Sequence, residues 1–463
     1  MITIHNKSNY IPHIIFIYIF MCMRLILTNG GIGQDYNQHL DYLALLMHGK
    51  PLPPQIPDPF GLYYLAYFST NIFGPVFGVP MLSLVACIGI AGCLILINNV
   101  IKRYMDGNMQ HLCLLYLSTL PVFVTTSVVF ASDSFVMIPF FVFCYLAYLF
   151  IKDIQSDQVL IRAIAIGIVQ ILGIFFKFTF ISLVPPSILL SIFYILKSST
   201  FSAPITRRLF VVLSICIVPS LFNIYFFTNS IQMGSLGLGV DTKGTMELRS
   251  FIPYSRDTAI LSAPALGDPI VKNGQQIKVN LQGEEDPKGE MGFQLLVENR
   301  YSYPALVHLA IHTDVRNLAL GEMTPSTQRT RANHIFQIMA VNCALILSVF
   351  VIATNLRFLF VAGLGAMSWV RSKFATCDEN LLLFITFWFP ALCWYCTIVL
   401  SLPFVHHPMY RWGYWTPRLI LPAIIVFGLI MFKHGNSLDH KTKTAFRVLV
   451  LLQVFFSLNL LIR

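Results

Sequence analysis

The chain has 463 residues, of which 56% are hydrophobic and only 11% are charged, and its formal net charge is +10. Soluble domains carry roughly 25% charged residues, so this composition excludes an ordinary soluble protein and indicates a polytopic integral membrane protein. The positive charge does not indicate nucleic-acid binding, because the long polar segment 229–334 holds eleven acidic and ten basic residues. The excess lies in the apolar part, where membrane lipids with anionic headgroups are the expected partners.

The first apolar segment runs from Tyr10 to Thr28. It has a weakly basic start and no small-residue cleavage site, so we expect a retained signal anchor and not a cleaved signal peptide. Later segments approach or exceed the about 18 apolar residues that cross a bilayer, which predicts an all-α bundle of about 11–13 transmembrane helices. These later spans are Val76–Val100, His111–Ala131, Ser134–Ile151, Leu160–Phe176, Phe180–Leu196, Leu209–Thr228, Ile335–Thr354, Asn380–Leu402, Leu419–Phe432 and Ala445–Leu461.

Basic residues divide the short loops into two groups, since Lys and Arg favour the cytoplasmic side. The remaining loops, with segments 229–334 and 403–418, are then predicted on the non-cytoplasmic face, which carries Asp35, Asp133 and Lys177. The basic loops contain Lys102 and Arg103, Lys152 and Arg162, Lys197 with Arg207 and Arg208, and Lys433 with Lys441 and Lys443.

A short apolar run, Phe358–Val370, lies between Arg357 and the pair Arg371 and Lys373. As a helix it spans only about 20 Å. A crossing here would invert all later loops. We therefore expect a half-helix or surface segment with both flanks in the cytoplasm.

The spans and loops predict three parts: an N-terminal transmembrane catalytic module over 1–228 with a first external loop at 29–75, an external segment over 229–334, and a C-terminal transmembrane module over 335–463. The external segment is rich in turn residues and is expected to be a small α+β or irregular insertion. Cys393 and Cys396 have redox or zinc spacing, but they lie in an apolar span, which favours packing.

Residues 35–48 predict an amphipathic helix at the membrane surface, because Tyr36, Leu40, Leu43, Ala44 and Met47 recur at helical spacing. A stop follows at Gly49 and Pro51. Asp35 and His39 are four residues apart on the other face and could meet a substrate together. The alternative is that Asp35 only caps the helix, as Asp often does.

A proline-stiffened stretch, residues 51–64, then leads into an aromatic helix that begins Gly61-Leu-Tyr-Tyr64. An acidic residue after the first transmembrane helix, a short amphipathic helix and this stretch resemble the opening of the GT-C class of membrane glycosyltransferases. The similarity is to the branch of dolichyl-phosphate-mannose-protein mannosyltransferases and aminoarabinose transferases. It implies a GT-C-like fold, and it implies that Asp35 is the acidic residue of the first external loop that the transfer needs.

Three later stretches resemble the family in the same order, so the resemblance covers residues 1–200 and 380–463. Two departures stand beside it: Asp35 lacks an adjacent carboxylate, because Gln34 and Tyr36 flank it, and segment 229–334 matches no family motif. The three stretches are Ser132-Asp133-Ser134, the run Gly173-Ile-Phe-Phe-Lys177-Phe-Thr-Phe180, and the run from Tyr410 through Arg411, Trp412, Tyr414 and Arg418 to Ala423.

The residues predict roles that suit transfer from a polyprenyl-phosphate-linked sugar. The leaving phosphate needs cations, for which Lys177, Arg411 and Arg418 are candidates, although Lys and Arg at helix ends also snorkel to headgroups. The acceptor hydroxyl must lose a proton, for which Asp35 is the candidate base, with His39 beside it. Asp133 could orient the acceptor, but an Asp in a short turn is also an ordinary turn residue.

Two further expectations concern metal and sugar. No cofactor is certain, but a divalent metal ion held by Asp35, Asp133, His406 and His407 is left open, against the alternative of interfacial histidines. An aromatic group could stack on the sugar or acceptor, although membrane interfaces produce the same composition. Its members are Tyr410, Trp412 and Tyr414.

The sequence therefore predicts an inverting glycosyltransferase that acts on the non-cytoplasmic face, with a lipid, glycan or protein acceptor and no nucleic-acid partner. The rivals are a transporter or flippase of lipid-linked glycans, which should show interrupted helices in related halves or charges at mid-membrane depth, and a non-catalytic assembly protein. Compact loops favour a bacterial inner membrane over the endoplasmic reticulum.

Overall fold

The computed structural model describes residues 10–29, 36–52, 60–199, 204–232, 271–272, 275–276, 311, 327–374, 377–401 and 419–462. Within these residues the regular structure is helical except for two short strands, β1 (Val271–Lys272) and β2 (Gln275–Gln276), which pair antiparallel. The predicted fold class, an all-α polytopic membrane protein, is confirmed.

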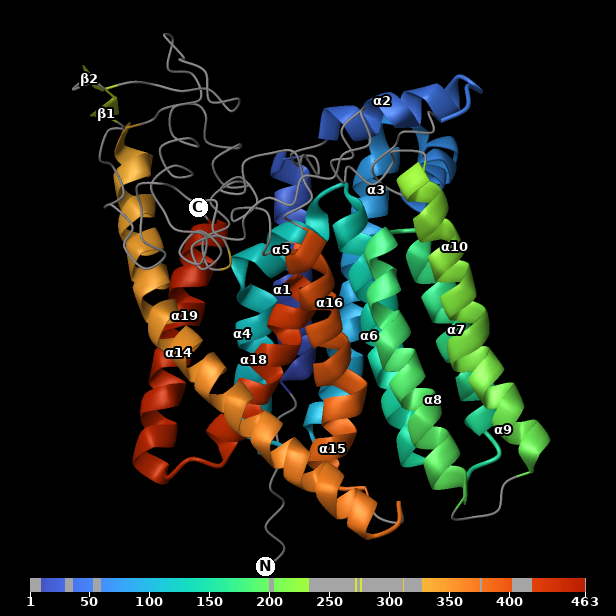
Figure 1. Ribbon diagram of the computed structural model, residues 1–463. Helices are drawn as coiled ribbons and strands as arrows, with labels where there is room; N and C mark the ends of the chain where they lie inside the picture. The colour runs from blue at the N-terminus through green and yellow to red at the C-terminus, as the bar shows by residue number, and fades with distance from the viewer. Residues whose placement is uncertain are drawn as a thin grey trace, which may run out of the picture.

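Most helices lie side by side between two ends of one bundle, and α2 lies across one of these ends (Figure 1). We call it the α2 end. We call the opposite end the basic end, because Lys102, Lys152, Lys197 and Lys433 occur where α3, α6, α8 and α18 end. The helices are α1 (Ile11–Asn29), α2 (Tyr36–Met47), α3 (Gly61–Ile101), α4 (Gly107–Thr119), α5 (Pro121–Val128), α6 (Ser132–Lys152), α7 (Val159–Ile174), η1 (Phe178–Leu183), α8 (Val184–Ser198), α9 (Ile205–Val212), η3 (Leu213–Ile217), α10 (Val218–Gln232), α14 (Thr327–Arg371), α15 (Glu379–Leu383), η4 (Phe384–Trp388), α16 (Phe389–Ser401), α18 (Leu421–Asn436) and α19 (His440–Ile462).

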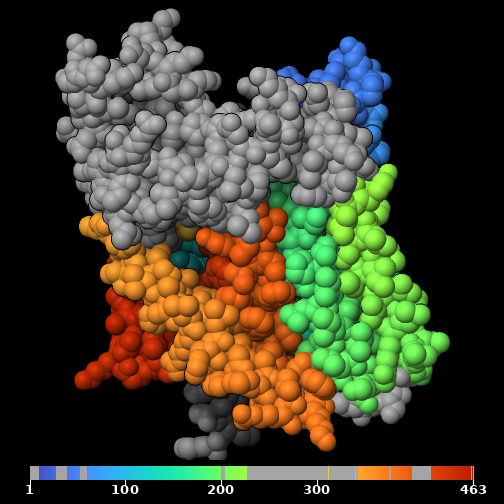
Figure 2. Space-filling view, viewed as in Figure 1, coloured from blue at the N-terminus to red at the C-terminus, as the bar shows by residue number. Residues whose placement is uncertain are grey.

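Length and composition mark the helices that could cross a membrane. In the part of the chain that the structure describes, six helical segments are long and apolar enough, and α4 with α5, bent by 55°, would make a seventh. Three shorter apolar helices, α1, α7 and α18, lie beside them. Each span expected from the sequence falls on one of these segments or on α19. In Figure 2, α14, α16, α8 and α10 follow one another across one face of the bundle.

Helix α3 is not a single straight rod, because it folds back on itself at Gly74. This glycine has φ +80°, a conformation that other residues rarely adopt, and Pro75 follows it. A Cβ added at Gly78 would lie 2.5 Å from the Cα of Thr70, whereas eight residues of straight helix span about 12 Å. The hydroxyl of Ser69 donates to the carbonyl of Gly78 at 2.6 Å across the fold. The aromatic arm that begins at Gly61 is thus pressed back against the span that follows.

Buried polar side chains join helices inside the apolar bundle. The amide of Gln170 in α7 donates to the carbonyl of Ile215 in η3 at 2.9 Å and accepts from the hydroxyl of Ser187 in α8 at 2.7 Å. On the other side, the amide of Asn355 donates to the carbonyl of Phe427 at 3.1 Å and accepts from the indole of Trp388 at 2.9 Å. Such bonds hold helices together where lipid offers no alternative partner.

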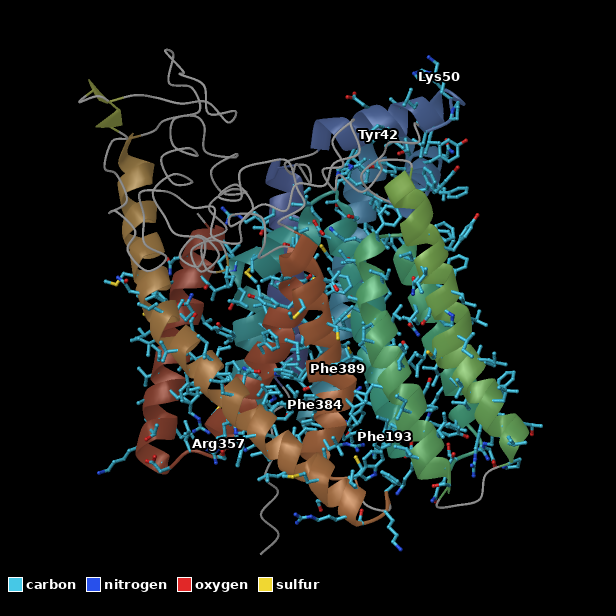
Figure 3. All side chains as sticks on the ribbon, in the orientation of Figure 1. Tyr42, Lys50, Phe193, Arg357, Phe384 and Phe389 are labelled. Carbon is cyan, nitrogen blue, oxygen red and sulfur yellow. The ribbon has the colours of Figure 1, made fainter. Side chains whose placement is uncertain are left out.

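The run Phe358–Val370 is expected to be a half-helix or a surface segment, but it forms no separate element, because α14 continues through it to Arg371. No proline interrupts the segment, so nothing in the backbone ends the helix at Arg357. Residues of this run nevertheless contact side chains at the basic end of the bundle. The ammonium of Lys433 lies 5.3 Å from the ring centroid of Phe358, and Trp369 stacks on Phe193 with centroids 4.4 Å apart. Arg357 and Phe193 are labelled toward the basic end in Figure 3.

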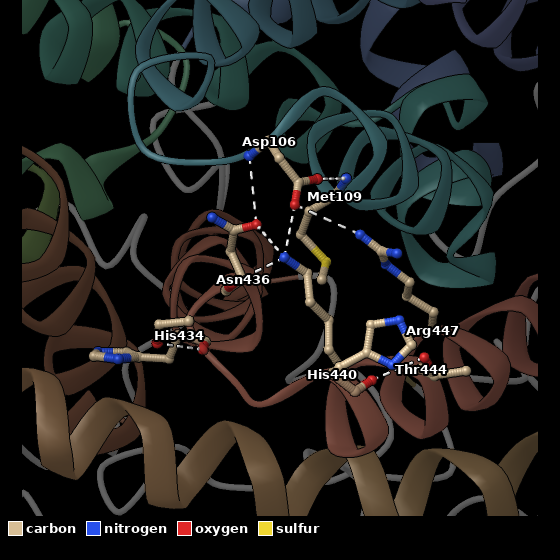
Figure 4. A network of polar contacts seen from close by, with 9 residues as sticks. Asp106, Met109, His434, Asn436, His440, Thr444 and Arg447 are labelled. Atoms are coloured by element: carbon tan, nitrogen blue, oxygen red, sulfur yellow. Dashed lines mark hydrogen bonds and ion pairs between the residues drawn. The ribbon is translucent and has the colours of Figure 1, made fainter.

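An ionic network at the basic end joins α4 to the turn between α18 and α19 (Figure 4). Asp106 caps α4 by accepting from the backbone N–H of Met109 at 2.8 Å. Its other oxygen lies 2.6 Å from the ammonium of Lys443 and 3.5 Å from the guanidinium of Arg447. Lys443 also donates to the backbone and side-chain oxygens of Asn436, both at 3.0 Å. The network fixes the final hairpin of the chain to the bundle.

Candidate active site

A buried ion pair joins Asp133 and Lys177 at the α2 end. Asp133 lies in the first turn of α6, where the helix dipole favours a carboxylate. Lys177 lies in extended conformation between α7 and η1, with its backbone N–H donating to the carbonyl of Gly173 at 3.0 Å. Their side chains are only 4% and 12% exposed. Residues 44 apart in the chain therefore form one charged unit that is almost removed from solvent.

Such a pair is costly to bury, and this cost is informative. Desolvation of two charges can exceed their mutual attraction, so buried pairs rarely persist for stability alone. Inside membrane proteins, ionisable side chains commonly mark a substrate path or a catalytic site. The pair between Asp133 and Lys177 is therefore the strongest candidate centre among the described residues.

A second polar pair, His39 with Tyr63, joins α2 to α3. The Nδ1 atom of buried His39 is 2.9 Å from the phenol oxygen of Tyr63 in the aromatic arm of α3. Phe130 packs edge-on against the His39 ring at 5.7 Å, and Tyr42 packs edge-on against Tyr63 at 5.4 Å. Tyr42 is labelled on α2 in Figure 3. The imidazole is thus held in one orientation by its hydrogen bond and by the neighbouring rings of Tyr63 and Phe130.

The predicted helix at residues 35–48 is present as α2, but its faces differ from the prediction. The side of α2 that packs against the protein is centred on His39 and Leu43, which are both buried. Ala44 and Met47, which belong to the apolar face predicted to meet the membrane surface, do not pack against the protein and are exposed. The prediction placed His39 on the opposite face, together with Asp35 four residues before it. His39 is buried instead, and Tyr63 supplies the hydrogen bond that permits this burial.

Backbone contacts bring the two pairs into one region. The backbone N–H of Gly61 donates to the carbonyl of Phe175 at 2.9 Å, which ties the start of α3 to the end of α7. A Cβ at Gly61 would lie 2.5 Å from that carbonyl oxygen, so only glycine permits the approach. Tyr63 follows Gly61 by two residues, and Lys177 follows Phe175 by two. On the other side, Phe135 stacks on Phe176 with centroids 5.8 Å apart.

Three predicted site residues therefore lie in one region: His39, Asp133 and Lys177. The others lie outside the described residues. In the described ranges no group of three or more His, Cys, Asp or Glu side chains is placed to hold a metal ion. The predicted residues outside the described part are Asp35, Tyr410, Arg411, Trp412, Tyr414 and Arg418, together with the predicted metal ligands His406 and His407.

Sequence reasoning assigned no role to Tyr63, Phe130 or Gly61. Tyr63 belongs to an aromatic-rich segment, and a hydrogen bond across 24 residues has no local signal. Gly61 gives a weak signal in the sequence. Glycine is a poor helix former, so its presence at the first position of a helix suggests that another chain segment approaches closely.

No family model and no curated protein matches the chain. Solved structures that match include two of an archaeal oligosaccharyltransferase from Archaeoglobus fulgidus. The apo form has 13% identity and a TM-score of 0.47. The second, AglB in complex with an inhibitory peptide and a dolichol-phosphate, has 11% identity and a TM-score of 0.45. Each alignment covers 98% of this chain and 56% of the other, so this chain spans little more than half of their length.

Proposed function

We propose that the chain is a membrane glycosyltransferase that moves a sugar from a polyprenyl-phosphate carrier to an acceptor at the α2 end. The observation that carries the proposal is the buried pair between Asp133 and Lys177, which lies where α6 begins and α7 ends. These helix ends are at the same end of the apolar bundle as α2 (Figure 1). A lipid phosphate lies at that depth when its chain is in the bilayer. Basic residues gather at the other end, which supports a non-cytoplasmic site.

Lys177 suits the leaving phosphate because an ammonium has three N–H donors. One of them meets Asp133, and this pairing leaves two for phosphate oxygens. As the bond between the anomeric carbon and the phosphate oxygen breaks, its electron pair stays on the phosphate, and negative charge grows there. A preplaced cation in a water-poor site stabilises this charge, by a factor of about 10² to 10³ in rate for one such group.

The acceptor hydroxyl attacks the anomeric carbon from the opposite side and loses its proton. We assign that proton to the carboxylate of Asp35, which gives inversion in a single displacement. Asp133 is assigned to hold Lys177 and to orient the acceptor. His39 is assigned to the acceptor side, where Tyr63 fixes its ring. Arg411 and Arg418 are proposed as further phosphate contacts, and Tyr410, Trp412 and Tyr414 as sugar or acceptor contacts.

The test measures sugar transfer in membranes that hold the full chain and a panel of sugars linked to dolichyl or undecaprenyl phosphate. Asp35→Asn, Asp133→Asn and Lys177→Gln are each expected to lower the rate by about 10² or more. Asp106→Asn, in the network at the basic end, is the matched control and should keep the wild-type rate. Wild-type rates in both Asp133→Asn and Lys177→Gln would refute the proposal.

A second candidate, a flippase for lipid-linked glycans, is favoured by the interrupted helices. The fold-back of α3 at Gly74 and the 55° bend between α4 and α5 are features of transporters. Reconstituted vesicles distinguish the two: a flippase moves labelled lipid-linked glycan to the other leaflet without an acceptor, whereas a transferase releases free polyprenyl phosphate only when an acceptor is present.

A further inference from the structure

A hollow at the basic end lies between the α6–α7 turn and α9, far along the bundle from the candidate active site. Its volume is about 450 Å³. Five side chains line it: two are apolar, one has a hydroxyl group, and two have opposite charges. The lining residues are Asp157, Leu160, Thr206, Arg207 and Phe210.

The two charges of the hollow do not pair with each other. Asp157 is exposed at the surface of the α6–α7 turn, and no ion pair joins it to Arg207 within the described residues. The guanidinium of Arg207 donates through Nη2 to the backbone carbonyl of Ser156 at 2.7 Å, which anchors it beside the hollow. Its buried Nε–H has no hydrogen-bond partner in the described part of the chain. A fixed cation and a separate anion therefore border the same space.

The hollow opens where the bilayer surface is expected. Phe210 is exposed on its wall, and the neighbouring Ile161, Ile205 and Leu209 are exposed as well. These apolar side chains continue along α7, which is a shorter apolar helix, and along the segment that begins with α9, which is long and apolar enough to cross a membrane. Polar walls at a helix end, continued by an apolar outer surface, match the boundary between lipid headgroups and hydrocarbon.

We propose that this hollow binds the headgroup of a phospholipid that carries a primary amine, of the phosphatidylethanolamine type. The guanidinium of Arg207 and the hydroxyl of Thr206 bind the phosphate, and the carboxylate of Asp157 binds the ammonium. Leu160 and Phe210 contact the glycerol and the first acyl carbons. A lipid with phosphate but no amine, such as phosphatidylglycerol, leaves the Asp157 carboxylate unpaired beside an anion.

The test is native mass spectrometry of the full chain, delipidated in detergent and titrated with phosphatidylethanolamine, phosphatidylglycerol or phosphatidylcholine with identical acyl chains. The wild type is expected to bind phosphatidylethanolamine about fivefold more tightly than phosphatidylglycerol. Arg207→Gln should weaken phosphatidylethanolamine binding about tenfold. Asp157→Asn should abolish the preference between the two lipids. Lys152→Ala, an exposed basic residue at the same end, is the matched control and should change neither value.

Equal binding of the amine lipid and phosphatidylglycerol by the wild type would overturn the assignment. An unchanged preference in Asp157→Asn would do the same, and this variant alters only an exposed side chain, so it remains informative if Arg207→Gln fails to fold. A competition arm adds glycerophosphoethanolamine, which has the headgroup without acyl chains. It should not displace the lipid at equal concentration, and displacement would show a site for a soluble phosphate compound.

Discussion

Two ion pairs at opposite ends of the bundle use the same chemistry in different surroundings. At the α2 end, Asp133 and Lys177 are 4% and 12% exposed. At the basic end, Asp106 is 44% exposed, and it meets Lys443 and Arg447 at the surface (Figure 4). Exposed pairs contribute at most about 1 kcal/mol, whereas the loss of one partner from a buried pair costs about 3–5 kcal/mol.

The two pairs differ in whether a structural role accounts for them. The network around Asp106 has an evident structural task, because it caps α4 and fixes the hairpin between α18 and α19. The pair between Asp133 and Lys177 lies where a hydrophobic pair would be cheaper to bury. Each variant below changes one side of this comparison.

The largest expected effect is at the buried pair. Asp133→Ala or Lys177→Met alone leaves an unpaired buried charge and should lower the free energy of unfolding by about 3–5 kcal/mol. The double variant removes both charges and should recover most of that loss while transfer stays absent. Unfolding in detergent and the transfer assay measure the two quantities. Additive losses in the double variant would mean that the two side chains do not interact.

Gly61→Ala should have the next largest effect. The new Cβ would lie 2.5 Å from the carbonyl oxygen of Phe175, so the contact between α3 and α7 must open. We expect a loss of about 1–3 kcal/mol in unfolding and a loss of transfer, because Lys177 follows Phe175 by two residues. Gly92→Ala is the matched control within α3, since nothing lies within 4 Å of its added Cβ. Equal behaviour of the two variants would contradict the close approach.

Tyr63→Phe tests the hydrogen bond that fixes His39. The substitution removes one partner of a buried hydrogen bond and should lower the free energy of unfolding by about 1–2 kcal/mol. The neighbouring Tyr64, which is 49% exposed, provides the control Tyr64→Phe with no expected effect. Thermal unfolding measures both, and the imidazole resonances of His39 should shift in the first variant only. An unshifted His39 resonance in Tyr63→Phe would count against the bond.

The smallest effect is expected for Asp106→Asn, which should lower the free energy of unfolding by no more than about 1 kcal/mol. Added salt should reduce this loss. Partial burial would raise the pKa of the Asp106 carboxyl, but hydrogen bonds from Lys443 and the Met109 N–H outweigh it and lower the pKa below 3.8. Because the folded pKa is the lower one, the stabilisation is present above pH 3.8 and is lost as the pH falls through the folded pKa. Unfolding of wild type and variant should therefore converge in acid. A gap that persists there would contradict the role of the charge.

Hydropathy and loop charge predicted much of this fold, because backbone N–H and C=O groups in lipid must bond to each other and a helix satisfies them within one segment. Within the described residues, each of the eleven expected spans falls on helices, and the predicted surface helix is α2. The fold-back at Gly74 was not predicted, since Gly and Pro mark a break but not the angle of the chain after it. The unbroken α14 was missed for the opposite reason, because basic Arg357 suggested a boundary where the helix continues.

The candidate site shows the same division. The sequence by itself determined that an acidic turn at Asp133 and a basic helix end at Lys177 lie on one face, since alternating spans fix the side on which each loop falls. Only the tertiary structure decided that these two charges meet, and that His39 is buried against Tyr63. The reason is physical: side-chain periodicity reports which face of a helix is apolar, whereas the partner that compensates a buried charge comes from another helix and leaves no local pattern.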